Sequence, residues 1–178
     1  MNHFMRGFIS YDEWVAYEAR LLRDLSIDVF RAIIKAIPWR QGIEKLVEFR
    51  QSRRGDYFIA VTGGFALLGL RAVEELGFDD YIGVELEVDE RGRITGFARS
   101  YPDFYGKGTA LLDYLAAKGI QPEKIICIGD NVNDLGMFRV CDVSIAFCPA
   151  NGVKVGDVDV YVVSCDMRKL VEVLKSID

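Results

Sequence analysis

Short apolar runs alternate with helical hydrophobic patterns along most of the chain. Runs typical of buried strands cover residues 57–61, 124–128, 143–147 and 159–163. Between these runs, apolar residues recur every three or four positions, as they do on one face of a helix. Residues 84–88 and 93–97 flank a polar turn and predict a β-hairpin. Strands that alternate with helices predict an α/β fold, in which a parallel sheet carries helices on both faces.

The first 38 residues show no strand pattern. Ser10, with Glu13 three positions later, matches the capping box that begins a helix. A second helical stripe follows and ends at Pro38. We therefore expect a helical appendage over residues 1–38 and an α/β core over residues 39–178.

Composition and charge narrow the class of protein. The 178 residues are 51% hydrophobic and 28% charged, as in a globular domain, and carry a net charge of −5. A protein that binds nucleic acid needs a basic surface, so we expect no nucleic-acid partner. No apolar run approaches the ~20 residues of a membrane span, and no signal peptide is apparent. We expect a cytoplasmic protein that does not bind a membrane.

The four cysteines include no C-x-x-C pair, and Cys127 falls within a predicted strand. We therefore expect reduced core thiols and neither disulfides nor zinc. The single histidine, His3, lies near the start of the chain, which argues against histidine-based catalysis.

Two loops carry residues suited to binding an anion. Thr62-Gly63-Gly64 follows a predicted strand, and its glycines allow backbone N–H groups to approach an anion; a tight turn is the alternative. Lys107 lies between two glycines before a predicted helix, where it could meet a phosphate; a solvated lysine is the alternative. Tyr101 stands where a Walker A loop needs glycine, and the spacing of a dinucleotide-binding loop is missing.

The most specific motif is Gly129-Asp130-Asn131-Val132-Asn133-Asp134, which directly follows the predicted strand 124–128. In open α/β sheets, ligands bind at this carboxyl edge. Carboxylate oxygens suit Mg²⁺, and Mg²⁺ suits a phosphate. The motif does not fit a calcium-binding loop, because Val132 falls on a ligand position.

Together these motifs resemble those of the haloacid dehalogenase-like (HAD) hydrolases, and most closely their phosphoserine phosphatase branch. The resemblance implies a HAD-like Rossmannoid core, with residues 1–38 as a partial helical cap. It also implies a Mg²⁺-dependent phosphatase that acts on a small phosphorylated metabolite. It assigns phosphate binding to Thr62, Gly63, Gly64, Lys107 and Asn133. It assigns the metal to Asp130 and Asp134, where Asp134 would hold Lys107 or a metal-bound water. Such roles suit phosphoryl transfer, which depends mainly on positioning and charge neutralisation.

One departure from the family concerns the nucleophile. In HAD hydrolases it is the first aspartate of an Asp-x-Asp motif near the N-terminus, and this sequence has none upstream of the Asp130 motif. We therefore expect an N-terminally shortened chain that lacks the first strand and is inactive as it stands. The alternative is a catalytically silent module that binds metal and phosphate or serves in assembly. A nucleotide-binding fold that uses the Thr62 loop is a third reading. Because a missing strand exposes two sheet edges, we also expect a homodimer or a rearranged sheet.

A second departure concerns the substrate. By resemblance, Glu18 stands at or near the position of the arginine that binds the substrate carboxylate in phosphoserine phosphatases. If Glu18 faces the site, it favours a substrate amine or hydroxyl; the alternative is a glutamate at the rim of the apolar stripe with its carboxylate in water.

Overall fold

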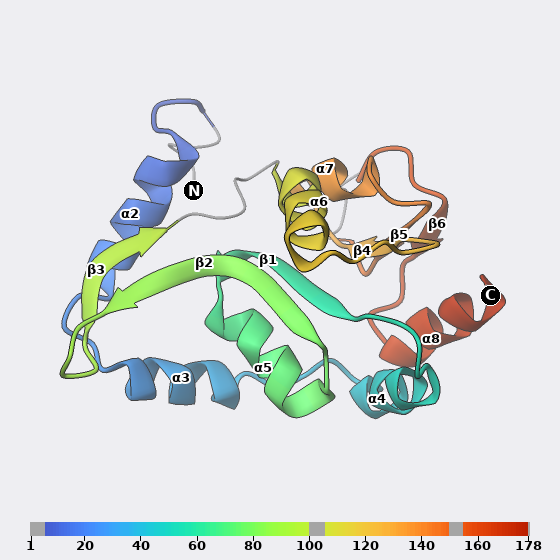
Figure 1. Ribbon diagram of the computed structural model, residues 1–178, viewed down its shortest axis with the longest axis horizontal. Helices are drawn as coiled ribbons and strands as arrows, with labels where there is room; N and C mark the ends of the chain where they lie inside the picture. Colours follow the sequence, from blue (N-terminus) through green and yellow to red (C-terminus); the bar gives the residue numbers. More distant parts are fainter. Residues whose placement is uncertain (1–5, 100–105, 150–154, 178) are drawn as a thin grey trace.

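The computed structural model describes residues 6–99, 106–149 and 155–177. Its strands form two three-stranded sheets, in the orders β1–β2–β3 and β4–β5–β6 (Figure 1). The first sheet contains β1 (Ile59–Phe65), β2 (Asp80–Val88) and β3 (Ile94–Arg99), with β1 parallel and β3 antiparallel to β2. The second contains β4 (Ile126–Gly129), β5 (Val143–Phe147) and β6 (Val160–Val162), all parallel. The predicted α/β fold and its hairpin are confirmed, although the strands divide between two sheets.

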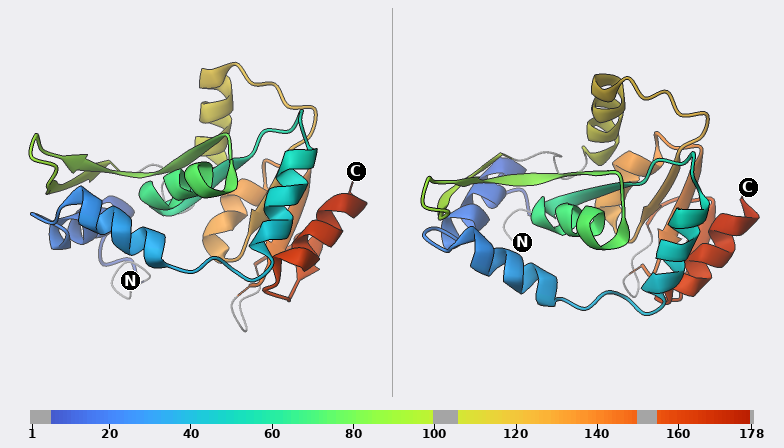
Figure 2. Two further views of the ribbon diagram at one scale, coloured as in Figure 1. Left: turned by 90° about the horizontal axis from the view of Figure 1, so that it is seen from below. Right: turned by 60° about the horizontal axis from the view of Figure 1, so that its bottom comes forward.

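Helices lie on both sides of these sheets (Figures 1 and 2). α2 (Tyr11–Leu21) packs along β3, and α5 (Leu67–Leu76) packs on β1 and β2. α4 (Ile43–Ser52) and α8 (Met167–Ser176) lie side by side against the second sheet. α6 (Lys107–Lys118) and the short α7 (Leu135–Phe138) pack together near β4. The remaining elements are α3 (Ile27–Ala36) and the single 3₁₀ turn η1 (Val132–Asp134).

Two clusters form the core of the α/β part. In one, side chains of α4 and α8 pack on the fully buried Ile145 of β5. In the other, Leu111 and Leu115 of α6 pack on Cys127 of β4, and Ile59 and Val61 of β1 border the same cluster. α6 therefore connects the two sheets through apolar contacts.

Local sequence signals explain several helix ends. Ser10 and Glu13 form the predicted capping box, with both hydrogen bonds present. Asp166 accepts a backbone N–H at the start of α8, and Gly77 and Gly119 end α5 and α6 in the left-handed conformation. α3 ends at Ala36, before Pro38.

The first strand differs from its predicted range of 57–61. It begins at Ile59, because the N–H of Phe58 donates to the Asp79 carboxylate at 2.8 Å and not to a strand partner. It continues to Phe65, which pairs with Val84 of β2. The Thr62-Gly63-Gly64 loop is thus part of the strand and does not follow it.

The prediction of reduced thiols was wrong for one pair of cysteines. Cys148, directly after β5, and Cys165, directly before α8, form a disulfide with their Cα atoms 4.7 Å apart. The fold brings these two segments together across 17 residues of sequence, which no local pattern reveals. Cys127 and Cys141 are free thiols, and Cys127 is buried in β4 as predicted.

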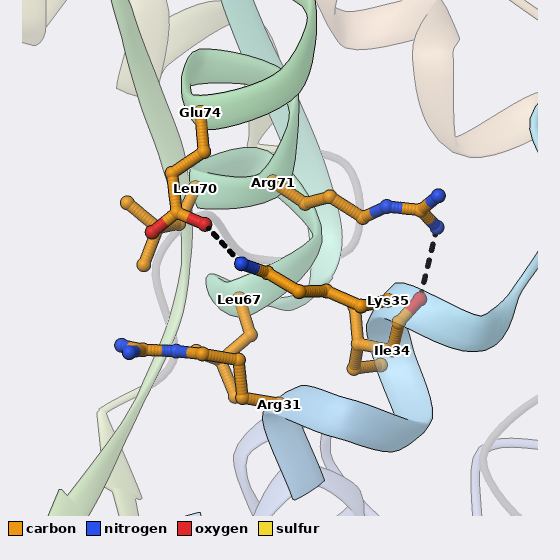
Figure 3. A pocket seen from close by; sticks show the side chains of 7 residues that line it. All are labelled: Arg31, Ile34, Lys35, Leu67, Leu70, Arg71 and Glu74. Carbon is orange, nitrogen blue, oxygen red and sulfur yellow. Dashed lines mark hydrogen bonds and ion pairs between the residues drawn. The ribbon is translucent and has the colours of Figure 1, made fainter. Parts of the chain in front are cut away.

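The interface between α3 and α5 is polar at its rim (Figure 3). Lys35 and Glu74 form an ion pair of 2.9 Å across it, and Arg71 donates to the backbone carbonyl of Ile34. A shallow hollow beside this ion pair is lined by Arg31, Leu67 and Leu70. Within the described residues, no helix has the length and hydrophobicity that crossing a membrane requires.

Candidate active site

A buried ion pair lies where α6 begins. Lys107 is the first residue of α6, and Asp134 is the last residue of η1, beyond the end of β4. Lys107 Nζ donates to Asp134 Oδ1 at 2.5 Å, and the two residues are only 6% and 2% exposed. Two opposite charges buried this deeply are stable only when they are paired and hydrogen-bonded. The pair therefore holds the loop after β4 against the start of α6.

The second oxygen of Asp134 fixes the loop itself. Oδ2 accepts the backbone N–H groups of Asp130 at 2.8 Å and Asn131 at 3.0 Å. This close approach requires glycine at position 129, because a Cβ there would overlap the Asp134 carboxylate. With both oxygens engaged, Asp134 orients Lys107 and the loop, which is the first of its two expected roles.

The Thr62-Gly63-Gly64 segment departs from regular pairing within β1. The register between β1 and β2 shifts between Val61 and Phe65. The N–H of Gly64 donates to Thr62 Oγ1 at 3.0 Å, and the carbonyl of Gly63 accepts the Tyr11 hydroxyl at 2.6 Å. The segment is thus held by side-chain contacts where the strand ladder is irregular.

The space beside Gly63 is where the three predicted loops meet. A Cβ built on Gly63 would lie 3.6 Å from Asn133 Nδ2 and 3.9 Å from Lys107 Cε. It would also lie 3.4 Å from Tyr11 Oη, which comes from the start of α2. Asn133 and Lys107 therefore lie beside a position that glycine leaves open, while the Tyr11 hydroxyl donates its hydrogen to the Gly63 carbonyl. The amide N–H groups of Asn133 and the ammonium group at the end of the Lys107 side chain suit an anion with acceptor oxygens.

The metal-ligating capacity of the site rests mainly on Asp130. Its side chain is exposed at the end of β4, next to the loop that Asp134 holds. Within residues 6–99, 106–149 and 155–177, no group of three or more His, Cys, Asp or Glu side chains could hold a metal ion. Mg²⁺ commonly binds through one or two carboxylates plus water and a substrate phosphate, so the residues present fit that ion once phosphate is bound.

Glu18 lies on α2, seven residues beyond Tyr11 and thus on the same side of the helix, and it is half-buried. Its carboxylate makes no hydrogen bond or ion pair with the residues that the structure describes. Among the described residues, no hydrogen bond or ion pair therefore joins Glu18 to the three loops.

Tyr11 was not among the residues predicted for the site. It belongs to the apolar stripe of α2, and its ring packs with Val15 and Val84. Nothing in the local pattern distinguishes a core tyrosine from one whose hydroxyl reaches a loop 52 residues away.

One Asp-x-Asp sequence does occur downstream, at Asp157 and Asp159. Asp159 directly precedes β6 and accepts hydrogen bonds from the backbone and hydroxyl of Ser144, near the amino end of β5. It therefore lies toward the amino ends of the strands, whereas the Asp130 loop follows the carboxyl end of β4.

Comparisons with known proteins show what this chain is similar to. The family model for haloacid dehalogenase-like hydrolases matches residues 3–139. A phosphoserine phosphatase from Archaeoglobus fulgidus is 35% identical over 145 residues, which cover 80% of this chain but 41% of that protein. A phosphoserine phosphatase from Methanocaldococcus jannaschii is 28% identical over 96% of this chain and 80% of its own length. A solved structure described as a phospho-aspartyl intermediate analogue of phosphoserine phosphatase superposes with a TM-score of 0.76, at 27% identity, over 97% of this chain and 81% of that chain.

Proposed function

The chain belongs to the haloacid dehalogenase-like hydrolases, and on that premise we propose that its three loops form the phosphate and Mg²⁺ shell of a phosphomonoester phosphatase. The observation that carries the proposal is the open position at Gly63, bounded by Asn133 Nδ2 and Lys107 Cε. The similarity to phosphoserine phosphatases supports a small phosphorylated metabolite as the substrate.

Each residue has a distinct role in this proposal. The Thr62 hydroxyl and the Gly63 amide bind oxygens of the transferring phosphoryl group, and Asn133 binds a further oxygen. Lys107 neutralises charge on the phosphoryl group while Asp134 keeps its ammonium in place. Bound Mg²⁺, held by Asp130, would supply charge neutralisation to the same group.

The nucleophile is the part that the described residues do not supply. In the proposed reaction, the phosphoryl group passes to an aspartate of a preceding strand, and water then releases phosphate. Among the described residues, the carboxylates of the site are Asp130 and Asp134, which we assign to metal and to Lys107. We therefore propose that the 178-residue chain binds phosphate with Mg²⁺ but does not hydrolyse p-nitrophenyl phosphate.

Two glycine variants test the phosphate shell. In Gly63→Ala, the new methyl group would occupy the space between Asn133 and Lys107, so phosphate binding should be lost. In Gly55→Ala, the methyl group would meet no atom within 4 Å and would lie outside that space, so binding should persist. Calorimetric titration of each folded variant with inorganic phosphate and MgCl₂ measures the difference. Equal affinity of the two variants would rule out the proposed site.

The alternative function is a silent module that keeps the phosphate and metal shell for binding or assembly. The absence of a nucleophile among the described site carboxylates favours it. The gene sequence directly before the Met1 codon separates the two functions. An in-frame Asp-x-Asp motif there supports the enzyme, whereas an in-frame stop codon supports the silent module.

We assign residues 1–38 to a partial cap and Glu18 to substrate choice. A carboxylate on the cap favours a phosphate ester that carries an amine or hydroxyl. Replacement by Glu18→Gln should weaken binding of phosphoethanolamine relative to inorganic phosphate. An unchanged ratio of the two affinities would remove Glu18 from the site.

We also propose a homodimer, because two strands lie at sheet edges. β1 and β4 are each the end strand of a three-stranded sheet in the part of the chain that the structure describes. Unpaired strand edges favour association with another chain. Light scattering should therefore report a dimer, and a monomer at high concentration would contradict this proposal.

A further inference from the structure

The peptide group between Gly63 and Gly64 is held from both of its ends. Its carbonyl oxygen accepts the hydroxyl of Tyr11 at 2.6 Å, and its N–H donates to Thr62 Oγ1 at 3.0 Å. Because a peptide unit is planar, fixing the carbonyl on one side also fixes the direction of the N–H on the other. Tyr11 therefore influences which group the N–H of Gly64 can reach.

The orientation of this peptide determines the hydrogen bonds of Thr62. A threonine hydroxyl has one hydrogen to donate and lone pairs that accept. Since Oγ1 accepts from Gly64, its own hydrogen is left for another acceptor. The methyl group of Thr62 lies close to Gly83, since a Cβ built on Gly83 would come within 2.9 Å of it.

Glycine on both sides makes this peptide easy to turn over. A flip of about half a circle rotates ψ of Gly63 and φ of Gly64 together, and glycine tolerates the positive φ that results. The flipped peptide would withdraw the Gly64 N–H from Thr62. Two hydrogen bonds favour the observed orientation, and the one to the carbonyl comes from Tyr11.

We propose that Tyr11 is a positioning residue whose hydroxyl holds the Gly63–Gly64 peptide so that the Thr62 hydroxyl hydrogen faces a phosphoryl oxygen. The inference rests on the proposed function, because it assigns Thr62 to phosphate. Tyr11 is the first residue of α2, so this contact also links the proposed cap to the phosphate loop. Its ring is 7% exposed and packs at 5.7 Å, edge-on, with Trp14, so the hydroxyl is delivered by a well-packed side chain.

The test compares Tyr11→Phe with Tyr17→Phe. The first variant keeps the packed ring and removes the hydroxyl; the second removes a hydroxyl from an exposed position on the same helix. Loss of one hydrogen bond predicts that Tyr11→Phe weakens phosphate binding by about fivefold. Tyr17→Phe should stay within about twofold of the wild type.

A rescue variant separates positioning from a general loss of structure. Alanine at position 64 disfavours the positive φ of the flipped peptide and fits the observed conformation. The double variant Tyr11→Phe/Gly64→Ala should therefore recover most of the phosphate affinity, which a merely structural defect would not do. If Tyr11→Phe binds phosphate as tightly as the wild type does, the positioning role is wrong.

NMR relaxation dispersion at the residue 64 amide tests the same role without phosphate. Tyr11→Phe should show exchange broadening at this amide, and the double variant and Tyr17→Phe should not. If the residue 64 amide of Tyr11→Phe shows no exchange broadening, the positioning role of Tyr11 is wrong. If the wild type binds no phosphate but Tyr11→Phe shows the broadening, the proposed function is wrong. The role of Tyr11 in holding the Gly63–Gly64 peptide is then still supported.

Discussion

Two buried cations in this chain differ in the groups that accept their hydrogen bonds. Arg71 of α5 and Lys107 of α6 are each 6% exposed and each paired with a carboxylate. Arg71 donates to the backbone carbonyls of Ile34 and Ile37 as well as to Glu75, and its guanidinium lies 4.2 Å from the centre of the Trp39 ring. Its donors are directed at the end of α3 and the segment that follows it.

Lys107 is surrounded differently. Its ammonium carries three hydrogens, and within the described residues its acceptor is one oxygen of Asp134. Its neighbours include the open position at Gly63, where a side chain would fit at ordinary contact distances. Arg71 thus donates to three residues of the protein and serves the fold, whereas Lys107 donates to Asp134 beside an open position and can serve a ligand.

The largest effect is expected from removing the carboxylate of the Lys107 pair. Asp134→Ala leaves a buried ammonium without its partner, which typically costs about 3–5 kcal/mol of stability. It also frees the N–H groups of Asp130 and Asn131. Urea unfolding measures the loss.

Glu172→Ala is the matched control for Asp134→Ala. It removes a carboxylate from the exposed pair with Lys169, and such pairs contribute at most about 1 kcal/mol. If Asp134→Ala were no more destabilising than this control, Lys107 would have another partner and the comparison with Arg71 would fail.

Replacing Arg71 should cause a smaller loss of stability and no loss of phosphate binding. Arg71→Met removes charged hydrogen bonds to two carbonyls and should lower stability by about 2–3 kcal/mol. Phosphate affinity below the unfolding temperature should stay within about twofold of the wild type. Lys107→Met should abolish phosphate binding.

Arg31→Met is the control for Arg71→Met, because Arg31 lines the same hollow from an exposed position. It should change stability by no more than about 0.5 kcal/mol. Equal loss of phosphate binding in Arg71→Met and Lys107→Met would mean that both cations serve the ligand.

The sequence predicted those features that depend on neighbouring residues. The capping box at Ser10 and the end of α3 before Pro38 each involve groups within about one helical turn. Thr62 and Asp130 could be chosen because each stands beside glycine at the end of a predicted strand, and Lys107 because it lies between two glycines before a predicted helix.

The features that the sequence did not reveal depend on distant contacts. The disulfide joins Cys148 to Cys165, and the hydroxyl of Tyr11 reaches Gly63. The strands alternate with helices whether they form one sheet or two, so the pattern carries no information on the division into β1–β2–β3 and β4–β5–β6. Arg71 was also missed, because an arginine within a helical stripe usually extends to solvent.

The smallest expected effect concerns acid and the Arg71 cluster. The hydrogen bond from Trp39 Nε1, at 2.7 Å, lowers the pKa of Glu75 below its ordinary value of 4.5, and the Arg71 hydrogen bond and charge lower it further. Because the folded pKa is lower than the unfolded one, the unfolded state binds the proton more readily. The stabilisation from Glu75 is therefore present above its ordinary pKa and is lost as the pH falls through the folded pKa.

Glu75→Gln should consequently have a slightly lower Tm than the wild type at neutral pH, and the two Tm values should converge as the pH falls below the folded pKa. Thermal unfolding followed by circular dichroism across this range measures the convergence.

Glu74→Gln, on the same helix, is the control, because it removes a neighbouring charge that pairs with Lys35 and leaves the contact between Trp39 and Glu75 in place. A constant difference in Tm between the wild type and Glu75→Gln at all pH values would show that the Glu75 charge does not stabilise the Arg71 cluster. Arg71 would then be held by the carbonyls of Ile34 and Ile37 and by Trp39. The difference from Lys107, which we expect to depend on its carboxylate partner, would be larger.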